Sequence, residues 1–169
     1  MKDSSSPSRR RFLALGSLAS LLPFVASCGG APAQAKKSFR VTRTDAQWRQ
    51  RLTKSEYYIL REAGTERRFT SQLNSEKRKG TYVCAGCGNK LYSSAHKYDS
   101  KTGWPSFYQA IDKGAVGAST DYKIGYPRTE VHCADCGGHL GHIFGDGPRP
   151  TGKRHCINGA AMDFIPAKA

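Results

Sequence analysis

The sequence has few acidic residues, no hydrophobic run long enough for a stable membrane span, and no internal repeat. Only 13 of its 169 residues are Asp or Glu, against 27 Lys or Arg, so the formal net charge is +14. The one extended apolar run, at residues 12–26, is too short to cross a bilayer as a stable helix. The missing repeat excludes solenoid folds.

The composition predicts one modest domain with many loops. The chain holds 18 Gly and 8 Pro, and its mean hydropathy is −0.58. Residues 36–169 are enough for a single small core. A domain of this kind usually needs an additional stabilising element, such as a metal or disulfides.

The positive charge does not by itself predict a nucleic-acid partner. The first 27 residues carry a net +3, which leaves about +11 on the rest. Basic segments such as 67–68 and 77–79 lack the interleaved aromatic residues of a surface that stacks bases. We therefore expect a solvated basic face and no nucleic-acid partner.

Residues 1–35 are predicted to be an export signal followed by a tether. The pair Arg9-Arg10 before an apolar run resembles a twin-arginine signal, although an ordinary secretory signal also begins with positive charge. Residues 25–28 resemble a lipoprotein box that would leave Cys28 as an acylated first residue. The competing cleavage follows Ala35 in an A-x-A site and would remove Cys28. We expect an exported monomer that is periplasmic or anchored facing the periplasm.

The order of local signals predicts helices first and an antiparallel sheet domain after them. Thr44 can cap a short helix that carries Trp48, and Ser55 can cap a second one that ends before Gly64. From residue 81 onward, short β-type runs are bounded by glycine or proline. The clearest lie at residues 81–84, 129–132, 142–144 and 155–158.

Four cysteines form two C-x-x-C pairs, Cys84 with Cys87 and Cys133 with Cys136. Four thiolates at this spacing are typical of one structural Zn(II) ion with a closed coordination shell. The alternative is disulfides, which an oxidising compartment would favour. We favour zinc, because two pairs of equal spacing are rarely needed for disulfides.

Cys156 is left without a partner. Its neighbours Lys153, Arg154 and His155 could favour the thiolate, which is the nucleophilic form. A buried structural cysteine beside Ile157 is an equally good interpretation of these residues alone.

Several motifs occur in a fixed order and carry a family resemblance. The chain from about residue 42 to 164 resembles the peptide methionine-R-sulfoxide reductases of the B type. The matching segments are 103–107 (GWPSF), 130–136 (EVHCADC), 139–144 (HLGHIF), 146–148 (DGP), 150–152 (PTG) and 154–158 (RHCIN).

The resemblance implies a mainly β fold of two small antiparallel sheets, with short amino-terminal helices and a zinc clamp on the face away from the active site. It implies that Cys156 is the nucleophile and that Trp104 forms the pocket for the methyl group of the sulfoxide. His139, His142 and Asn158 would bind or protonate the sulfoxide oxygen, because a thiolate attacks a sulfoxide only when that oxygen is polarised. The substrates would be oxidised methionines in proteins or peptides.

Glu130 and Asp146 are candidates for orienting a histidine, and ordinary sheet-edge carboxylates are the alternative.

The chain departs from the family at one position. Many members have a second, resolving cysteine just before the GWPSF segment, and this chain has Thr102 there. We therefore expect a single redox cysteine that is regenerated by an external thiol, such as a thioredoxin-type donor.

Two other classes fit parts of the pattern. One is a basic zinc module that binds nucleic acid or a partner protein, and the other is a thiol-disulfide oxidoreductase that uses one C-x-x-C pair.

Overall fold

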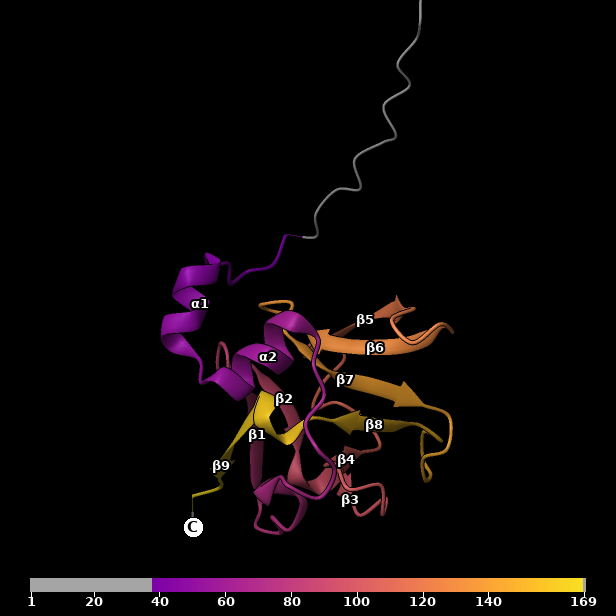
Figure 1. Ribbon diagram of the computed structural model, residues 1–169. Coiled ribbons are helices and arrows are strands. Elements are labelled where there is room, and N and C mark those ends of the chain that lie inside the picture. The colour runs from indigo at the N-terminus through magenta and orange to yellow at the C-terminus, as the bar shows by residue number, and fades with distance from the viewer. Residues whose placement is uncertain (1–37, 169) are drawn as a thin grey trace, which may run out of the picture. The chain divides into compact units, whose positions relative to one another are not determined.

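The computed structural model describes residues 38–168, which form one compact unit (Figure 1). The expectations for residues 1–35, including the export signal and Cys28, lie outside the described residues. Among the residues that are described, no helix is both long enough and apolar enough to cross a membrane.

Two short helices open the domain, α1 (Asp45–Arg51) and α2 (Lys54–Glu62). Thr44 caps α1, as the sequence predicts. Thr53 caps α2, so the expectation that Ser55 is the cap is wrong. The Thr53 side chain accepts from the Glu56 amide, and the Glu56 carboxylate accepts from the Thr53 amide. This reciprocal pair satisfies two amides at once, whereas Ser55 has no Glu or Gln three residues later.

The rest of the described chain is mainly β, in two antiparallel sheets. The smaller sheet has the strand order β2-β1-β9, and the larger has the order β3-β4-β8-β7-β6-β5. The strands are β1 (Gly80–Cys84), β2 (Lys90–Ser93), β3 (Lys97–Tyr98), β4 (Ser106–Phe107), β5 (Val116–Asp121), β6 (Arg128–Cys133), β7 (His139–Phe144), β8 (Arg154–Ile157) and β9 (Met162–Pro166). Three 3-10 turns complete the chain: η1 (Gln72–Asn74) lies between α2 and β1, η2 (Ser94–His96) between β2 and β3, and η3 (Gly159–Ala161) between β8 and β9. The predicted fold class is confirmed.

One hydrophobic core connects both sheets and both helices. Tyr82 from the small sheet and Phe107 from the large sheet are fully buried, and their ring centroids lie 4.9 Å apart. The Tyr92 ring stacks on Phe107, with the ring centroids 4.3 Å apart. Trp48 and Leu60 add the apolar faces of α1 and α2 to the same cluster. Burial of these large side chains supplies most of the driving force for folding.

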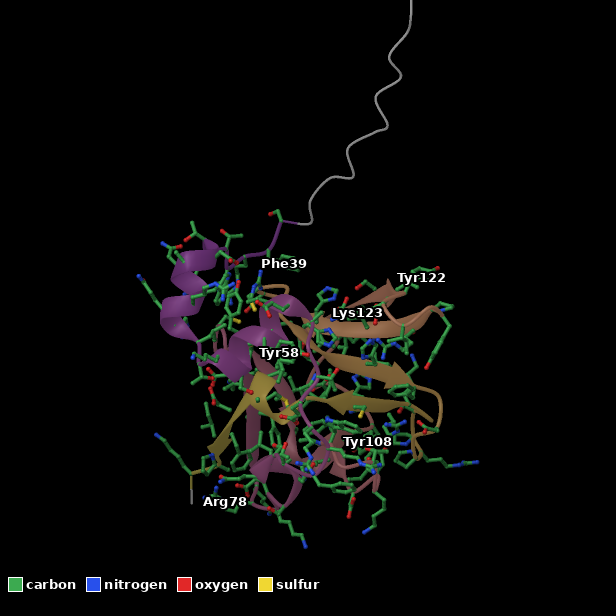
Figure 2. All side chains as sticks on the ribbon, viewed as in Figure 1. Phe39, Tyr58, Arg78, Tyr108, Tyr122 and Lys123 are labelled. Atoms are coloured by element: carbon green, nitrogen blue, oxygen red, sulfur yellow. The ribbon has the colours of Figure 1, made fainter. Side chains whose placement is uncertain are left out.

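The helices are also tied to the far edge of the large sheet. Lys123, in the turn between β5 and β6, donates from Nζ to the carbonyl of Ala63 at 2.9 Å and to that of Glu62 at 3.4 Å (Figure 2). These carbonyls lie at the end of α2, where unsatisfied acceptors favour a cation.

Candidate active site and metal centre

The antiparallel pair β6 and β7 carries candidate chemistry at both of its ends. Cys133 ends β6, and Cys136 lies in the turn that joins β6 to β7. Arg128, at the start of β6, and Phe144, at the end of β7, line a cavity at the opposite end. We call these the cysteine end and the cavity end.

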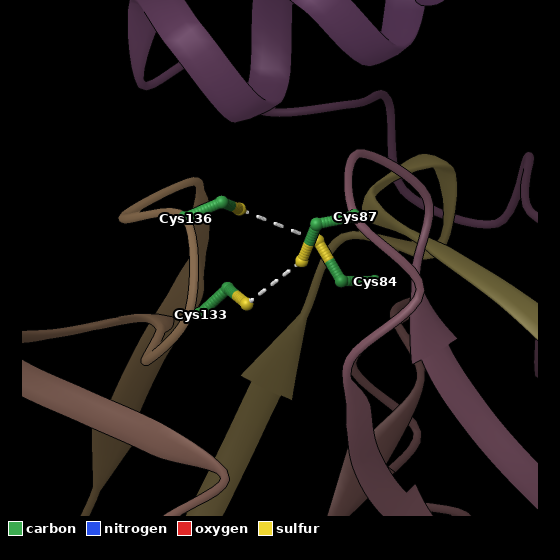
Figure 3. A group of neighbouring side chains, drawn as sticks. All are labelled: Cys84, Cys87, Cys133 and Cys136. Atoms are coloured by element: carbon green, nitrogen blue, oxygen red, sulfur yellow. Dashed lines mark hydrogen bonds between the residues drawn. The ribbon is translucent and has the colours of Figure 1, made fainter. Parts of the chain in front are cut away.

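The four cysteines of the two C-x-x-C pairs converge at the cysteine end (Figure 3). Cys84 Sγ lies 3.7 Å from Cys136 Sγ, and Cys87 Sγ lies 3.6 Å from Cys133 Sγ. All four sulfurs lie within 4.8 Å of one another. Cys84 ends β1 in the small sheet and Cys133 ends β6 in the large one. The cluster therefore joins the two sheets.

The geometry fits a tetrahedral metal and does not fit disulfides. With Zn–S bonds of about 2.3 Å, the sulfurs of a tetrahedral site lie roughly 3.8 Å apart. Disulfide sulfurs lie only about 2.05 Å apart. The four thiols are all free and mostly buried, and a ring of four sulfurs is the donor set that Zn(II) prefers.

Backbone and arginine contacts hold the two cysteine loops in place. Gly88 (φ 76°) and Gly137 (φ 67°) take left-handed conformations that let each loop turn after its second cysteine. Arg51 of α1 donates to the carbonyl of Gly86 at 2.8 Å, and Arg61 of α2 donates to that of Cys136 at 3.1 Å. Each helix thus binds one loop, and the helices cover the cluster.

Cys156 lies on β8, a central strand of the large sheet, and borders a cavity of about 140 Å³. A cavity of this size accepts a side chain and not a folded segment. Beside the thiol, Gly141 of β7 permits a close strand approach, because a Cβ there would clash with the Cys156 carbonyl oxygen. The lining residues are Thr65, Trp104, Arg128, Gly141, His142, Phe144, Cys156 and Asn158.

The pKa of Cys156 is raised by burial, and the positive charge of Arg154 opposes that effect. The Arg154 guanidinium is itself fixed by two hydrogen bonds of 2.9 Å to the Asp146 carboxylate. Asp146 therefore orients an arginine and not a histidine. A thiolate at Cys156 depends on the groups that can compensate for its burial.

His155 does not support the thiolate, contrary to the expectation from its position in the sequence. It packs away from the cavity, with Nδ1 3.1 Å from the buried hydroxyl of Tyr92. Burial, with a smaller effect from Lys153, lowers the pKa of His155 to about 4. The ring is therefore neutral at neutral pH and adds no positive charge.

The two candidate histidines lie side by side, with ring centroids 5.3 Å apart, but only His142 lines the cavity. His142 Nε2 is 2.8 Å from Asp121 Oδ2. Burial lowers the pKa of His142, and the bond to Asp121 opposes this. His139 lies behind it, with Nδ1 2.7 Å from Glu130 Oε1. Glu130 thus orients a histidine, which is one of the two alternatives that its sequence position allows.

Trp104 and Asn158 form adjoining parts of the cavity wall, and Glu66 connects them. The indole Nε1 of Trp104 donates to the Glu66 carbonyl at 3.1 Å, and the Glu66 amide donates to Asn158 Oδ1 at 3.0 Å. The Glu66 carboxylate accepts from the amides of Gly159 at 2.6 Å and Ala160 at 3.0 Å. Asn158 follows β8 directly and keeps an extended backbone. Glu66 thus fixes the Trp104 indole, the Asn158 side chain and the turn that follows β8.

Sequence reasoning missed Glu66, Asp121, Arg128 and Phe144. Glu66 lies in the irregular segment after α2, 90 residues before Cys156, and no periodic pattern marks it. Asp121 and Arg128 face each other across the β5–β6 hairpin, where Arg128 donates to Asp121 Oδ2 at 2.5 Å. A short hairpin with oppositely charged residues at its two strand ends is the only signal that could have found them.

A family model described as the SelR domain matches residues 52–166, and this range contains both the cysteine cluster and the cavity. The chain belongs to the B-type peptide methionine-R-sulfoxide reductase family. Its SelR domain covers nearly all of the described residues.

Relatives from distant organisms are similar over the same part of the chain. The peptide methionine sulfoxide reductase MsrB of Leptospira interrogans is 52% identical over 127 residues, which are 75% of this chain and 97% of that protein. The MsrB of Thiobacillus denitrificans is 53% identical over 73% of this chain and 94% of its own length. The chloroplastic reductase B1 of Oryza sativa subsp. japonica is 52% identical over 75% of this chain and 59% of its own length.

Proposed function

We propose that this enzyme reduces the R epimer of methionine sulfoxide in oxidised proteins and peptides back to methionine. The observation that carries the proposal is the cavity at Cys156, where one free thiol, an indole and a histidine face a space the size of a side chain. Family membership supports the same reaction.

In the proposed reaction, the Cys156 thiolate attacks the sulfur of the sulfoxide while its oxygen is protonated. The S–O bond of the substrate breaks, and the oxygen ends on Cys156 as a sulfenic acid. Two electrons pass from the cysteine sulfur to the methionine sulfur, and one proton is taken up. A protonated His142 can supply this proton and keep its bond to Asp121. Asn158 lines the same cavity. Its side-chain amide gives one N–H to the Leu140 carbonyl at 3.0 Å and would give the other to the sulfoxide oxygen, while His139 would support His142.

Trp104 accounts for stereospecificity in this proposal. A flat indole held at its Nε1 by Glu66 can contact the methyl group of the sulfoxide and exclude water. When the methyl group and the oxygen are both fixed, only one epimer presents its sulfur to Cys156.

An external thiol would complete the cycle. Within residues 38–168, the four other cysteines all belong to the cluster at the opposite end of β6 and β7. One equivalent of a thiol would condense with the sulfenic acid to give a mixed disulfide and water, and a second would release Cys156 as a thiol. A thioredoxin-type donor, with two neighbouring thiols, suits both steps.

The cysteine cluster would hold one structural Zn(II) through Cys84, Cys87, Cys133 and Cys136. With four sulfur ligands the ion has no open position, so its contribution is stability and not chemistry. We also propose that residues 1–35 direct export to the periplasm and that Cys28 carries a lipid anchor. Metabolic labelling with a fatty acid should then mark the full chain and not its Cys28→Ala variant.

The test uses separated R and S epimers of a blocked methionine sulfoxide peptide. We expect the wild type to reduce only the R epimer, and Cys156→Ser to lose at least about 10³-fold in kcat/KM. The rival thiol-disulfide oxidoreductase would use a C-x-x-C pair and predicts that Cys156→Ser keeps its activity. Equal rates on both epimers, or full activity in Cys156→Ser, would refute the proposal.

A further inference from the structure

Three hydroxyl side chains form a connected row that ends at Cys156. Thr102 Oγ1 lies 4.0 Å from Cys156 Sγ. Ser100 Oγ lies 2.8 Å from Thr102 Oγ1 and 2.7 Å from Ser106 Oγ. Ser106 Oγ is 3.3 Å from the carbonyl oxygen of Trp104. We call this set, Thr102, Ser100 and Ser106, the hydroxyl chain.

The sheet register fixes the hydroxyl chain beside the thiol. Ser106 on β4 is paired directly with Cys156 on β8, so the two side chains lie on the same face of the sheet. Ser106 is only 1% exposed, and Cys156 is partly buried. A buried hydroxyl needs partners, and the hydroxyl chain provides them without bulk water.

The hydrogen bonds of the hydroxyl chain can run in either direction, because each hydroxyl both donates and accepts and its hydrogen rotates. When Cys156 is a thiol, S–H donates to Thr102, Thr102 to Ser100, Ser100 to Ser106, and Ser106 to the Trp104 carbonyl. When Cys156 is an anion, the three bonds that join sulfur, Thr102, Ser100 and Ser106 reverse, so that Thr102 donates to sulfur. Ser106 then donates to Ser100 and no longer to the Trp104 carbonyl, which can only accept. The Trp104 carbonyl is the acceptor that makes the first arrangement complete.

We propose that the hydroxyl chain switches direction during the reaction and donates, through Thr102, to the thiolate and then to the sulfenic oxygen of Cys156. The inference rests on the proposed function for the role of Cys156 as nucleophile. The Thr102 hydroxyl keeps the oxidised sulfur hydrogen-bonded until an external thiol arrives.

The geometry explains why the donor is a threonine hydroxyl. A separation of 4.0 Å is long for a contact with a thiol, but it leaves room for an oxygen atom bonded to Cys156. Arg154 supplies positive charge near the sulfur, and its guanidinium already binds Asp146. The hydroxyl chain is therefore a second, independent donor that carries no charge.

The first experiment titrates Cys156 in the metal-loaded full chain and does not require enzymatic activity. Iodoacetamide alkylation is followed against pH, and modification at Cys156 is counted by mass spectrometry of the digest. The variants are Thr102→Val, which removes the hydroxyl and keeps the shape, Thr102→Ser, which keeps the hydroxyl, and Ser100→Ala, which breaks the second link. Ser75→Ala removes an exposed hydroxyl that bonds only within its own turn and serves as the matched control.

We expect Thr102→Val to raise the apparent pKa of Cys156 by about one unit, and Ser100→Ala to raise it by about half a unit. Thr102→Ser and Ser75→Ala should match the wild type. Melting temperatures confirm that each variant is folded. An unchanged pKa in Thr102→Val overturns the proposal. A shift in Thr102→Val with none in Ser100→Ala also overturns it, because the residues would not act as a chain.

The second experiment follows the sulfenic acid after one equivalent of R sulfoxide without a reductant. Trapping with dimedone at increasing times gives its lifetime, and mass spectrometry gives the sulfinic product. The lifetime should fall severalfold in Thr102→Val and Ser100→Ala but not in Thr102→Ser. An equal lifetime in all four proteins overturns this part. If the wild type forms no sulfenic acid, the proposed function fails while the alkylation result still stands.

Discussion

The cysteine end and the cavity end of β6 and β7 both present thiols, yet they give sulfur opposite environments. At the cysteine end, four sulfurs are one another's neighbours, and arginines from both helices fix the loops that carry them. At the cavity end, one sulfur borders an open space, and the groups that favour its ionised form are Arg154 and Thr102. A thiol is reactive where neighbouring groups stabilise its thiolate but no metal occupies the sulfur, so that a substrate can reach it.

The largest expected effect comes from removing one ligand of the cluster. Cys87→Ser should unfold the domain, because a structural zinc site contributes about 10 kcal/mol and a domain of this size has only about 5–15 kcal/mol in total. Cys156→Ser should change the free energy of unfolding by less than about 1 kcal/mol. Thermal unfolding with and without a chelator measures both.

A Cys87→Ser protein with the wild-type melting temperature would show that the cysteine end does not contribute more to stability than the cavity end. So would a wild-type melting temperature that is insensitive to the chelator.

The next effect concerns Glu66, which shapes the cavity without touching the thiol. Glu66→Gln keeps the backbone bonds to Trp104 and Asn158 but weakens one charge-assisted bond to the amides of Gly159 or Ala160. The resulting loss of about 1.4 kcal/mol should lower kcat/KM for the R sulfoxide about tenfold. The rate of Cys156 alkylation should not change.

The exposed carboxylate of Glu62 provides the matched control, as Glu62→Gln. If both variants lost activity equally, or if alkylation slowed in Glu66→Gln, Glu66 would not act by holding the cavity wall.

The smallest effect is a shift in pH dependence. The Asp121 carboxylate raises the pKa of His142 against the effect of burial. The protonated, proton-donating form exists below that pKa and is lost as pH rises through it. At high pH, kcat/KM falls as His142 loses its proton. Asp121→Asn should therefore move this fall to lower pH by about one unit. The pH profile of kcat/KM measures this, with Asp99→Asn as the control, because the Asp99 carboxylate binds Lys101 and not His142.

If the fall of kcat/KM at high pH occurs at the same pH in Asp121→Asn as in the wild type, His142 does not supply the proton. In that case Asn158 would be the remaining donor among the candidate residues that line the cavity.

Much of the fold could be predicted from the sequence because its signals are local. Capping residues and glycine-bounded runs predicted both helices and four of the strands, within one to three residues at their ends. The error at Ser55 arose because a serine is a good cap only when a reciprocal partner lies three residues later, and Thr53 has that partner in Glu56. The strand order could not be derived in this way, because β9 pairs with β1 across about 80 residues.

The sequence could name candidate site residues where residue type alone limits the chemistry. Two C-x-x-C pairs of equal spacing favour a metal over disulfides, and Cys156 is then left over. The contacts of His139, His142 and Glu66 depend on which side chains the sheet brings together, and spacing along the chain does not contain that information. His139 illustrates the limit, since it is three residues from His142 and yet lies outside the cavity lining.

The position of β8 in the chain also determines the order in which the parts of the enzyme can assemble during synthesis. β8 lies between β4 and β7, and β9 closes the small sheet against β1, although both strands come late in the chain. During synthesis, both C-x-x-C pairs emerge before residue 154, so the cluster can assemble on a chain that still lacks Cys156. A polypeptide interrupted between residues 136 and 154 would hold all four cysteines of the cluster but would lack Cys156 and the strand that joins the two parts of the large sheet. The enzyme can therefore be active only after β8 has been synthesised and has inserted between β4 and β7.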